Sequence, residues 1–306
     1  MAIARRPRAI HKLSERIIEW LLFLAAASSV AVTVGIVFVL ITESYEFFKF
    51  LYEEGRIVEF FTGTRWTPGF AQAAYGILPL LNGTLLIAGL ALVIAIPFGL
   101  TTAIYISEFA SSQLRETIKP LMELLSDVPT VVYGYFALIF VTPLLQQTLL
   151  PGMGGFNALS AGLVMGIMII PYIASVSEDS MRAVPMSLRE GSYAMGATRL
   201  ETSFRVVMPA AISGVIAAFI LGISRAVGET MIVKIAAGSQ PVMTLDPTES
   251  VSTITAFIVA IAQGDLPYGS MAFLSIFAAG LTLFVMTLLF NLIAFWMRAR
   301  YREIYE

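Results

Sequence analysis

Six long apolar segments dominate the sequence and restrict what the chain can fold into. They are 17–41, 79–107, 124–146, 158–177, 208–236 and 271–297. Apolar residues make up 58% of the 306 residues, charged residues only 13%, and the mean hydropathy is +0.83. A soluble domain carries about a quarter charged residues. The apolar surplus therefore predicts that the solvent of this chain is the lipid bilayer.

Each apolar segment is predicted to be a helix that crosses the membrane. About 20 apolar residues are needed for a helical span, and backbone groups in lipid must be hydrogen-bonded within the segment. No alternation of the kind found in membrane barrels is present. We therefore predict an all-α membrane protein with one six-span domain over 17–297, flanked by tails 1–16 and 298–306.

The first apolar segment follows the basic stretch "RRPRAIHK" and is interrupted only by Glu19. It is longer than the apolar core of a cleaved signal peptide. We expect it to remain in the protein as a membrane span.

Lysine and arginine are distributed unevenly between the predicted loops. Fourteen of the nineteen lie in the two tails and in the loops after spans two and four, against three in the other loops. The positive-inside rule then predicts that both termini are cytoplasmic. The same rule makes 178–207 a cytoplasmic loop and 43–78 and 238–270 external segments. The two remaining basic residues, Arg225 and Lys234, lie in span five.

The two external segments have different patterns. Acids alternate with aromatic residues in 43–78, which suits an interfacial amphipathic helix followed by a loop. The apolar run "STITAFIVAIAQG" in 238–270 is too short to span, so a re-entrant or surface helix is expected there.

Several kinds of chemistry are excluded by the residues available. The chain has no cysteine and one histidine, His11, so no metal site is predicted. None of its four lysines ends a Gly-rich phosphate-binding loop, so no ATP site is expected. We predict a transport subunit without enzymatic activity, bound cofactor or nucleic-acid partner.

The cytoplasmic loop contains the stretch "REGSYAMGATRLETSFRVVMPAAISG". Its pattern predicts a short amphipathic helix over 187–195 that ends at Gly196, where glycine can turn the chain. A second helical stretch, 198–208, then leads to Pro209 at the mouth of span five. A compact polar element of this kind suits docking of a soluble partner.

This loop resembles the EAA signature of ABC importer permeases. The residues that match its spacing are Glu190, Gly191, Ser192, Gly196, Val206, Met208 and Pro209. The chain departs from the signature at Gly191 and Ser192, where the family has alanines. The resemblance implies a coupling helix that sits in a cleft of an ATPase subunit, with Glu190 facing that subunit.

Three further stretches, 128–138, 167–199 and 224–231, resemble the permeases of phosphate-specific (Pst) transporters. The external segment and "RWTPGFAQAAYGILPLLNGTLL" are most similar to the C-type subunit. The resemblance implies the fold of a type I ABC importer permease in the cytoplasmic (inner) membrane of a prokaryote. The implied partners are a second Pst-type permease in a heterodimer, two copies of an ATPase that binds ATP and Mg, and an extracytoplasmic phosphate-binding protein.

Charges inside span five form the candidate substrate path. Arg225 and Glu229 are spaced i, i+4, which places them on one face of a continuous helix. Charges within a span are costly and by default face an interior or a pathway. The planar guanidinium of Arg225 can grip two oxygens of an anion such as phosphate. We expect Glu229 to neutralise Arg225 until a passing phosphate competes for it, and in Pst permeases the matching pair is implicated in translocation.

Alternatives remain open at this stage. The pair of Arg225 and Glu229 could instead lock span five to a neighbouring helix. Lys234 suits an interfacial anchor, with a funnel for incoming anions as the alternative. An ABC permease for another oxyanion such as sulfate or molybdate would share the coupling loop. A secondary transporter would need no ATPase, but the inverted repeats typical of that class are not evident.

Overall fold

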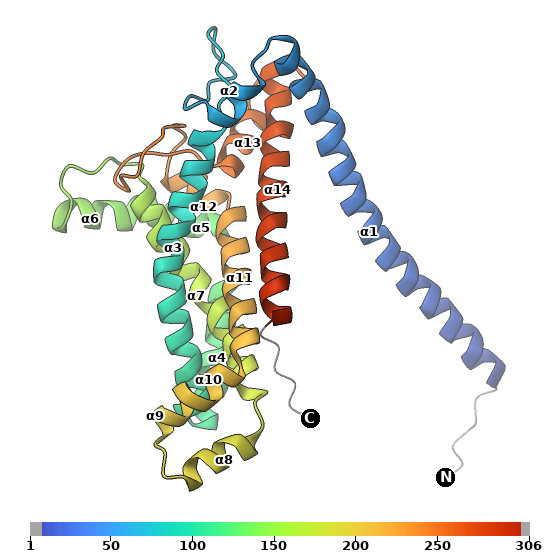
Figure 1. The fold of residues 1–306 in the computed structure, drawn as a ribbon, viewed down its shortest axis with the longest axis vertical. Helices are drawn as coiled ribbons and strands as arrows, with labels where there is room; N and C mark the ends of the chain where they lie inside the picture. Colours follow the sequence, from blue (N-terminus) through green and yellow to red (C-terminus); the bar gives the residue numbers. More distant parts are fainter. Residues whose placement is uncertain (1–7, 301–306) are drawn as a thin grey trace.

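The computed structural model describes residues 8–300, and the regular structure in that range is helical, apart from one isolated β-bridge between Trp66 and Tyr75. Its long helices other than α1 run side by side, and short helices lie at both ends of the bundle (Figure 1). The α-helices are α1 (Arg8–Glu53), α2 (Ile57–Thr62), α3 (Leu78–Ile104), α4 (Ser112–Ser126), α5 (Thr130–Phe136), α6 (Thr142–Thr148), α7 (Ala158–Arg182), α8 (Met186–Ala194), α9 (Arg199–Thr202), α10 (Met208–Ala210), α11 (Ile212–Gly228), α12 (Met231–Ala236), α13 (Ile254–Ala262) and α14 (Met271–Arg300). Three π-helical turns extend them: η1 (Tyr105–Phe109), η2 (Ala137–Val141) and η3 (Ser203–Val207).

Five of the six predicted spans are present as long apolar helices, and the predicted fifth span differs from the expectation. Among the described residues, five helical stretches are long and apolar enough to cross a membrane, and a bent pair supplies the sixth. That pair, Arg199–Ala210 and Ile212–Gly228, bends by 76°. The start of α1, the end of α14 and the connecting helix α8 lie at the same end of the molecule (Figure 1), as expected when both termini are cytoplasmic.

Three boundaries differ from the sequence-based expectation. Residues 43–53 continue α1 without a break and do not form a separate interfacial helix. Residues 112–126 form α4, an amphipathic helix that ends before Pro129. Span three therefore begins at Thr130 and not at 124, because the residue before a proline disfavours helical geometry.

Small residues hold α3 and α7 close together. A Cβ atom at Gly166 would lie 2.8 Å from the carbonyl oxygen of Ala91, and one at Gly162 would lie 2.7 Å from Leu90 Cβ. Glycine at both positions lets the two helices approach more closely than larger side chains allow. This pair forms the centre of the buried core and positions the helices that carry the charged residues.

A cap of aromatic residues covers the external end of the bundle. Phe47, Phe60, Trp66, Tyr75 and Phe257 are buried there, and their rings meet mostly edge to face. The cap joins the end of α1 to α2, the following loop and α13. The 238–270 segment therefore contributes a packed helix, α13, rather than a further span.

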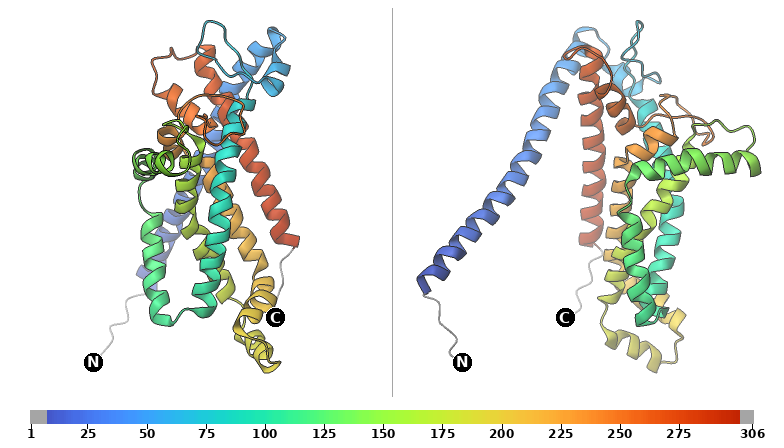
Figure 2. Two further views of the ribbon diagram at one scale, coloured as in Figure 1. Left: turned by 90° about the vertical axis from the view of Figure 1, so that its left-hand side faces the viewer. Right: turned by 180° about the vertical axis from the view of Figure 1, so that it is seen from behind.

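Helix α1 leaves the bundle as it runs towards its N-terminal end. It packs on α14 at the external end and diverges from it along its length (Figure 2). None of its most apolar window is buried. An apolar helix in this position is suited to a lipid or protein neighbour.

Candidate functional site

The chain breaks between α11 and α12 at Glu229, in the middle of the predicted fifth span. Glu229 has extended backbone geometry, with φ −67° and ψ 135°, and α12 begins at Met231. The expectation that Arg225 and Glu229 share one face of a continuous helix is therefore wrong. Gly228 ends α11. The side-chain carboxylate of Glu229 then accepts hydrogen bonds from the first backbone N–H groups of α12.

The carboxylate of Glu229 caps the start of α12. Its Oε1 accepts hydrogen bonds from the backbone N–H groups of Met231, at 3.0 Å, and Ile232, at 3.3 Å. The hydroxyl of Thr255, in α13, donates to the carbonyl oxygen of Glu229 at 2.7 Å. The side chain of Glu229 is 3% exposed. These bonds hold the extended link in place and satisfy backbone groups that have no partner within the helices.

Arg225 remains close to Glu229 although the helix is broken. Its Nη2 lies 3.9 Å from Glu229 Oε2, and its guanidinium carbon lies 5.6 Å from the centre of the Tyr172 ring. The side chain is 38% exposed, and its buried Nε has no hydrogen-bond partner within the described chain. The ion pair is therefore loose, and within the described chain the guanidinium makes no hydrogen bond.

Lys234 is set apart from this pair in its bonding. Its Nζ donates to the hydroxyl of Ser239 at 2.9 Å, and it forms no ion pair within residues 8–300. It lies in the last turn of α12, where a positive charge is favourable. The choice between an interfacial anchor and an anion funnel stays a prediction.

The predicted coupling segment forms a projecting loop at the other end of the molecule. Helix α8 ends before Gly196, whose φ of +84° is the left-handed geometry that glycine adopts without strain. The hydroxyl of Ser192 bonds that of Thr202, in α9, at 2.8 Å. Glu190 and Gly191 are exposed on α8, and Pro209 is exposed in α10. Figure 2 shows α8 beyond the ends of the long helices.

One residue essential to the placement of this segment was not singled out by sequence reasoning. Arg189 is almost fully buried and contacts Glu108 in η1, with Nη2–Oε1 at 2.9 Å and Nε–Oε2 at 3.2 Å. It also donates to the carbonyl oxygens of Val184 and Met181. In the sequence it counted only as a positive charge of the cytoplasmic loop. Its position next to Glu190 was the sequence feature that could have marked it as a residue that places this segment.

A model of the family "Binding-protein-dependent transport system inner membrane component" matches residues 95–303 of the chain. The chain belongs to this family. The match begins within α3 and leaves out α1, α2 and the cap residues that precede α3, and it contains both α8 and the Arg225 region.

Named relatives agree with this assignment. A probable ABC transporter permease protein, YqgH of Bacillus subtilis, is 36% identical over 79% of this chain and 78% of its own length. The phosphate transport system permease protein PstC of Haemophilus influenzae is 36% identical over 74% of this chain and 76% of its own length. The chain is thus a PstC-like permease of the ABC importer class, as its motifs indicated.

Solved structures share the fold at low sequence identity. A chain of a bacterial alginate ABC transporter, in complex with an alginate-bound periplasmic protein, aligns over 94% of this chain and 96% of its own length, with a TM-score of 0.64 and 16% identity. A chain of the MetNI methionine ABC transporter aligns over 74% and 95%, with a TM-score of 0.54 and 17% identity. These structures show the fold alone, and the family match makes the chain a multi-pass inner-membrane component of a transport system.

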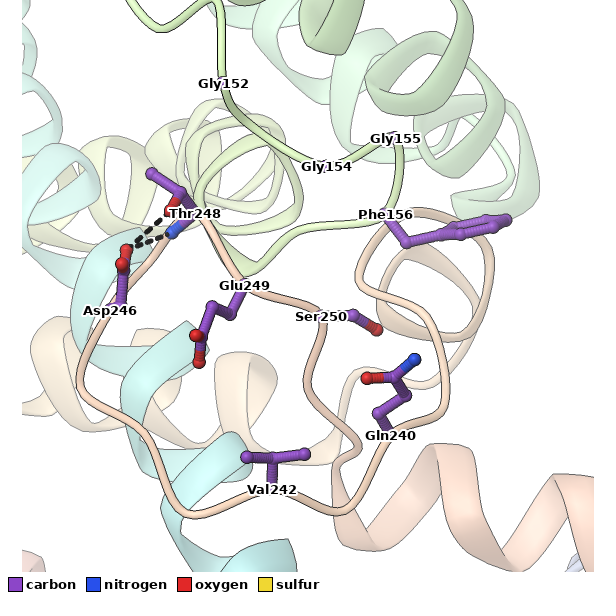
Figure 3. A pocket seen from close by; sticks show the side chains of 10 residues that line it. All are labelled: Gly152, Gly154, Gly155, Phe156, Gln240, Val242, Asp246, Thr248, Glu249 and Ser250. Atoms are coloured by element: carbon purple, nitrogen blue, oxygen red, sulfur yellow. Dashed lines mark hydrogen bonds between the residues drawn. The ribbon is translucent and has the colours of Figure 1, made fainter.

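The permease also has a cavity of about 630 Å³ on its external side (Figure 3). Residues from two loops line it: Gly152, Gly154, Gly155, Phe156, Gln240, Val242, Asp246, Thr248, Glu249 and Ser250. Asp246 accepts hydrogen bonds from the backbone and hydroxyl of Thr248, which lower the pKa of its carboxyl. Within residues 8–300 no group of histidine and acidic residues is arranged to hold a metal.

Proposed function

We propose that this permease passes inorganic phosphate from an extracytoplasmic binding protein to the cytoplasm as part of an ATP-driven importer. The observation that carries the proposal is the 36% identity to a phosphate transport permease over three quarters of both chains. The loose Arg225–Glu229 pair supports it, because a free guanidinium in a low-dielectric span suits a passing oxyanion.

The broken helix changes how the pair would act. Glu229 is committed through Oε1 to the start of α12, so only Oε2 faces Arg225, at 3.9 Å. Phosphate would replace this long contact with short, two-point hydrogen bonds from the guanidinium, and Glu229 would remain in place. Arg225 is the substrate-binding group in this proposal, and Glu229 positions it and limits its charge.

The partners follow from the same proposal. A second Pst-type permease would complete the path, and two ATPase copies carrying ATP and Mg would dock on the segment around Glu190. The splayed α1 and the exposed face of α8 are surfaces that such neighbours could cover. A binding protein would dock on the external side.

Reconstitution of the purified complex in liposomes tests the proposal. Uptake that requires the binding protein and ATP should occur with phosphate and not with sulfate or molybdate. Arg225→Gln should abolish uptake while the complex still assembles and hydrolyses ATP. Loss of assembly in this variant would show that the pair only locks the helices, and equal transport of all three anions would reject the substrate.

A further inference from the structure

The end of the molecule that carries α8 contains a second basic site, distinct from Arg225. A pocket of about 360 Å³ lies between η1, α4, the end of α7 and the α8–α9 segment. The residues that line it are Ser107, Glu108, Ala110, Arg115, Arg182, Met186, Arg189, Tyr193 and Arg199. Four arginines and one glutamate in one concave surface are an unusual concentration of positive charge.

Two of the four arginines form the walls of the pocket. Arg189 is paired with Glu108 and bonded to two carbonyl oxygens. Arg115 donates to the carbonyl oxygens of Ile106 and Ser107 at the end of η1. These contacts fix both side chains, and the charge of Glu108 is neutralised by Arg189.

The other two arginines, Arg182 and Arg199, have guanidinium N–H groups without hydrogen-bond partners in the described part of the chain. Arg182 is 53% exposed, and its only ion-pair contact within residues 8–300 is a long one, 3.7 Å from Nη1 to Glu178 Oε1. The side chain of Arg199 makes no hydrogen bond or ion pair in the described part of the chain and is exposed. The two guanidiniums come from different elements, α7 and α9, and open into the same pocket.

Among the described residues, the nearby acids make no ion pair with Arg199 and only the long contact of Glu178 with Arg182. Glu178 is buried and accepts a 2.8 Å hydrogen bond from Lys119, which also pairs with Asp179. Arg115 stands 3.7 Å from the same carboxylate. The carboxylates around the pocket are therefore already shared among other cations.

The pocket is on the inner face of the coupling helix. Met186, Arg189 and Tyr193 line it from α8 at spacings of three and four residues, which is one helical face. Glu190 is not among the lining residues and is exposed. Glu190 lies one helical turn from Met186 and from Tyr193, so a partner docked at Glu190 would border the pocket.

We propose that this pocket binds a phosphate-type oxyanion, held by Arg182 and Arg199. Guanidinium groups bind such oxyanions by two parallel hydrogen bonds, and two of them from different elements can clamp one ligand. The ligand would tie α9 to the end of α7 and so stiffen the coupling segment against the bundle. Free phosphate and the headgroup of an anionic phospholipid offer the same chemistry, and the proposal is independent of what the permease transports.

The test uses the complex purified without its binding protein, in an Arg225→Gln background that removes the pathway arginine. Binding of radiolabelled inorganic phosphate and retention of phosphatidylglycerol, relative to phosphatidylethanolamine, are measured for Arg182→Gln and Arg199→Gln. Arg205→Gln, an exposed arginine of η3 outside the pocket, is the matched control. Each pocket variant should weaken binding of the ligand about tenfold, as expected for one charged hydrogen-bonded contact.

Weaker phosphate binding in the two pocket variants would identify free phosphate as the ligand. Weaker retention of phosphatidylglycerol alone would identify a lipid headgroup, and either result supports the site. The proposal is overturned if both ligands bind the pocket variants as they bind the parent, or if Arg205→Gln weakens binding equally. The transport proposal would fail in a different measurement, the uptake assay, if phosphate uptake persisted in Arg225→Gln.

Discussion

Arg189 in α8 and Glu108 in η1, 81 residues apart, form a two-point ion pair that attaches α8 to η1, the continuation of α3. Their side chains are 9% and 5% exposed. The segment around Glu190 is thus fixed to the membrane bundle by its immediate neighbour in the sequence. A movement of α8 would be transmitted to α3 through this pair.

Removing one partner of this pair should destabilise the permease strongly. Arg189→Ala leaves Glu108 buried without its cation, a change that costs about 3–5 kcal/mol in buried pairs. Thermal unfolding in detergent should show a lowered midpoint, and ATPase stimulation by the binding protein should fall. Glu116→Gln, on the exposed face of α4, is the control and should change neither quantity. An unchanged midpoint in Arg189→Ala would contradict the attachment role.

The two functions of Glu229 should be separable by substitution. Glu229→Gln keeps an oxygen that can accept the N–H bonds of Met231 and Ile232 but removes the charge beside Arg225. Glu229→Ala removes both, and the uncapped buried N–H groups should lower stability by about 1–3 kcal/mol. We expect near-parental unfolding with altered uptake for the glutamine variant. If both variants unfold alike, the cap contributes nothing.

The aromatic ring of Tyr172 should support the position of Arg225. Its ring lies below the guanidinium, and its hydroxyl donates to the carbonyl oxygen of Ser126. A cation–π contact contributes about 0.5–2 kcal/mol. Tyr172→Leu should therefore reduce phosphate uptake several-fold, whereas Tyr172→Phe keeps the ring and should retain most of it. Equal loss in both variants would assign the effect to the hydroxyl.

Close packing of α3 on α7 should depend on Gly166. Gly166→Ala places a methyl group 2.8 Å from the carbonyl oxygen of Ala91 and 3.0 Å from Ile94 Cβ, so the helices must separate. Overpacking of this kind costs about 1–3 kcal/mol. Gly89→Ala on α3, where a Cβ meets nothing within 4 Å, should leave the unfolding midpoint unchanged or raise it. Equal effects of the two substitutions would refute the close contact.

The external cap should lose stability in acid through Glu59. Hydrogen bonding from Arg56, with Nε–Oε2 at 2.7 Å, lowers the pKa of Glu59 below its ordinary value near 4.5. A lowered pKa means that the stabilisation is complete above the ordinary value and is lost as the pH falls through the lowered one. The unfolding midpoint of the parent should therefore approach that of Glu59→Gln as the pH falls below the lowered pKa of Glu59. A pH-independent difference between the two would contradict the pair's contribution.

The long apolar helices of the chain could be predicted from the sequence alone, and its orientation stays a prediction. Apolar length requires a helix because lipid offers no hydrogen-bond partner, and the basic residues of the loops select the side. The coupling loop was also predictable, because Gly196 and Pro209 act on the backbone near their own positions. These features depend on local properties of the chain.

Contacts between distant segments determined the rest. Nothing in the apolar run 208–236 shows that the chain breaks at Glu229, since the break depends on the carboxylate capping α12 and on Thr255 from α13. In the sequence Arg189 is one of several basic residues of the cytoplasmic loop, and only the folded structure places it against Glu108 of η1. The same applies to Arg182 and Arg199, which share a pocket only because the end of α7 and the start of α9 both line it. Local sequence determined which segments are apolar and where the charged residues stand among them. Tertiary packing determined which charged side chains are paired and which are free to bind an anion.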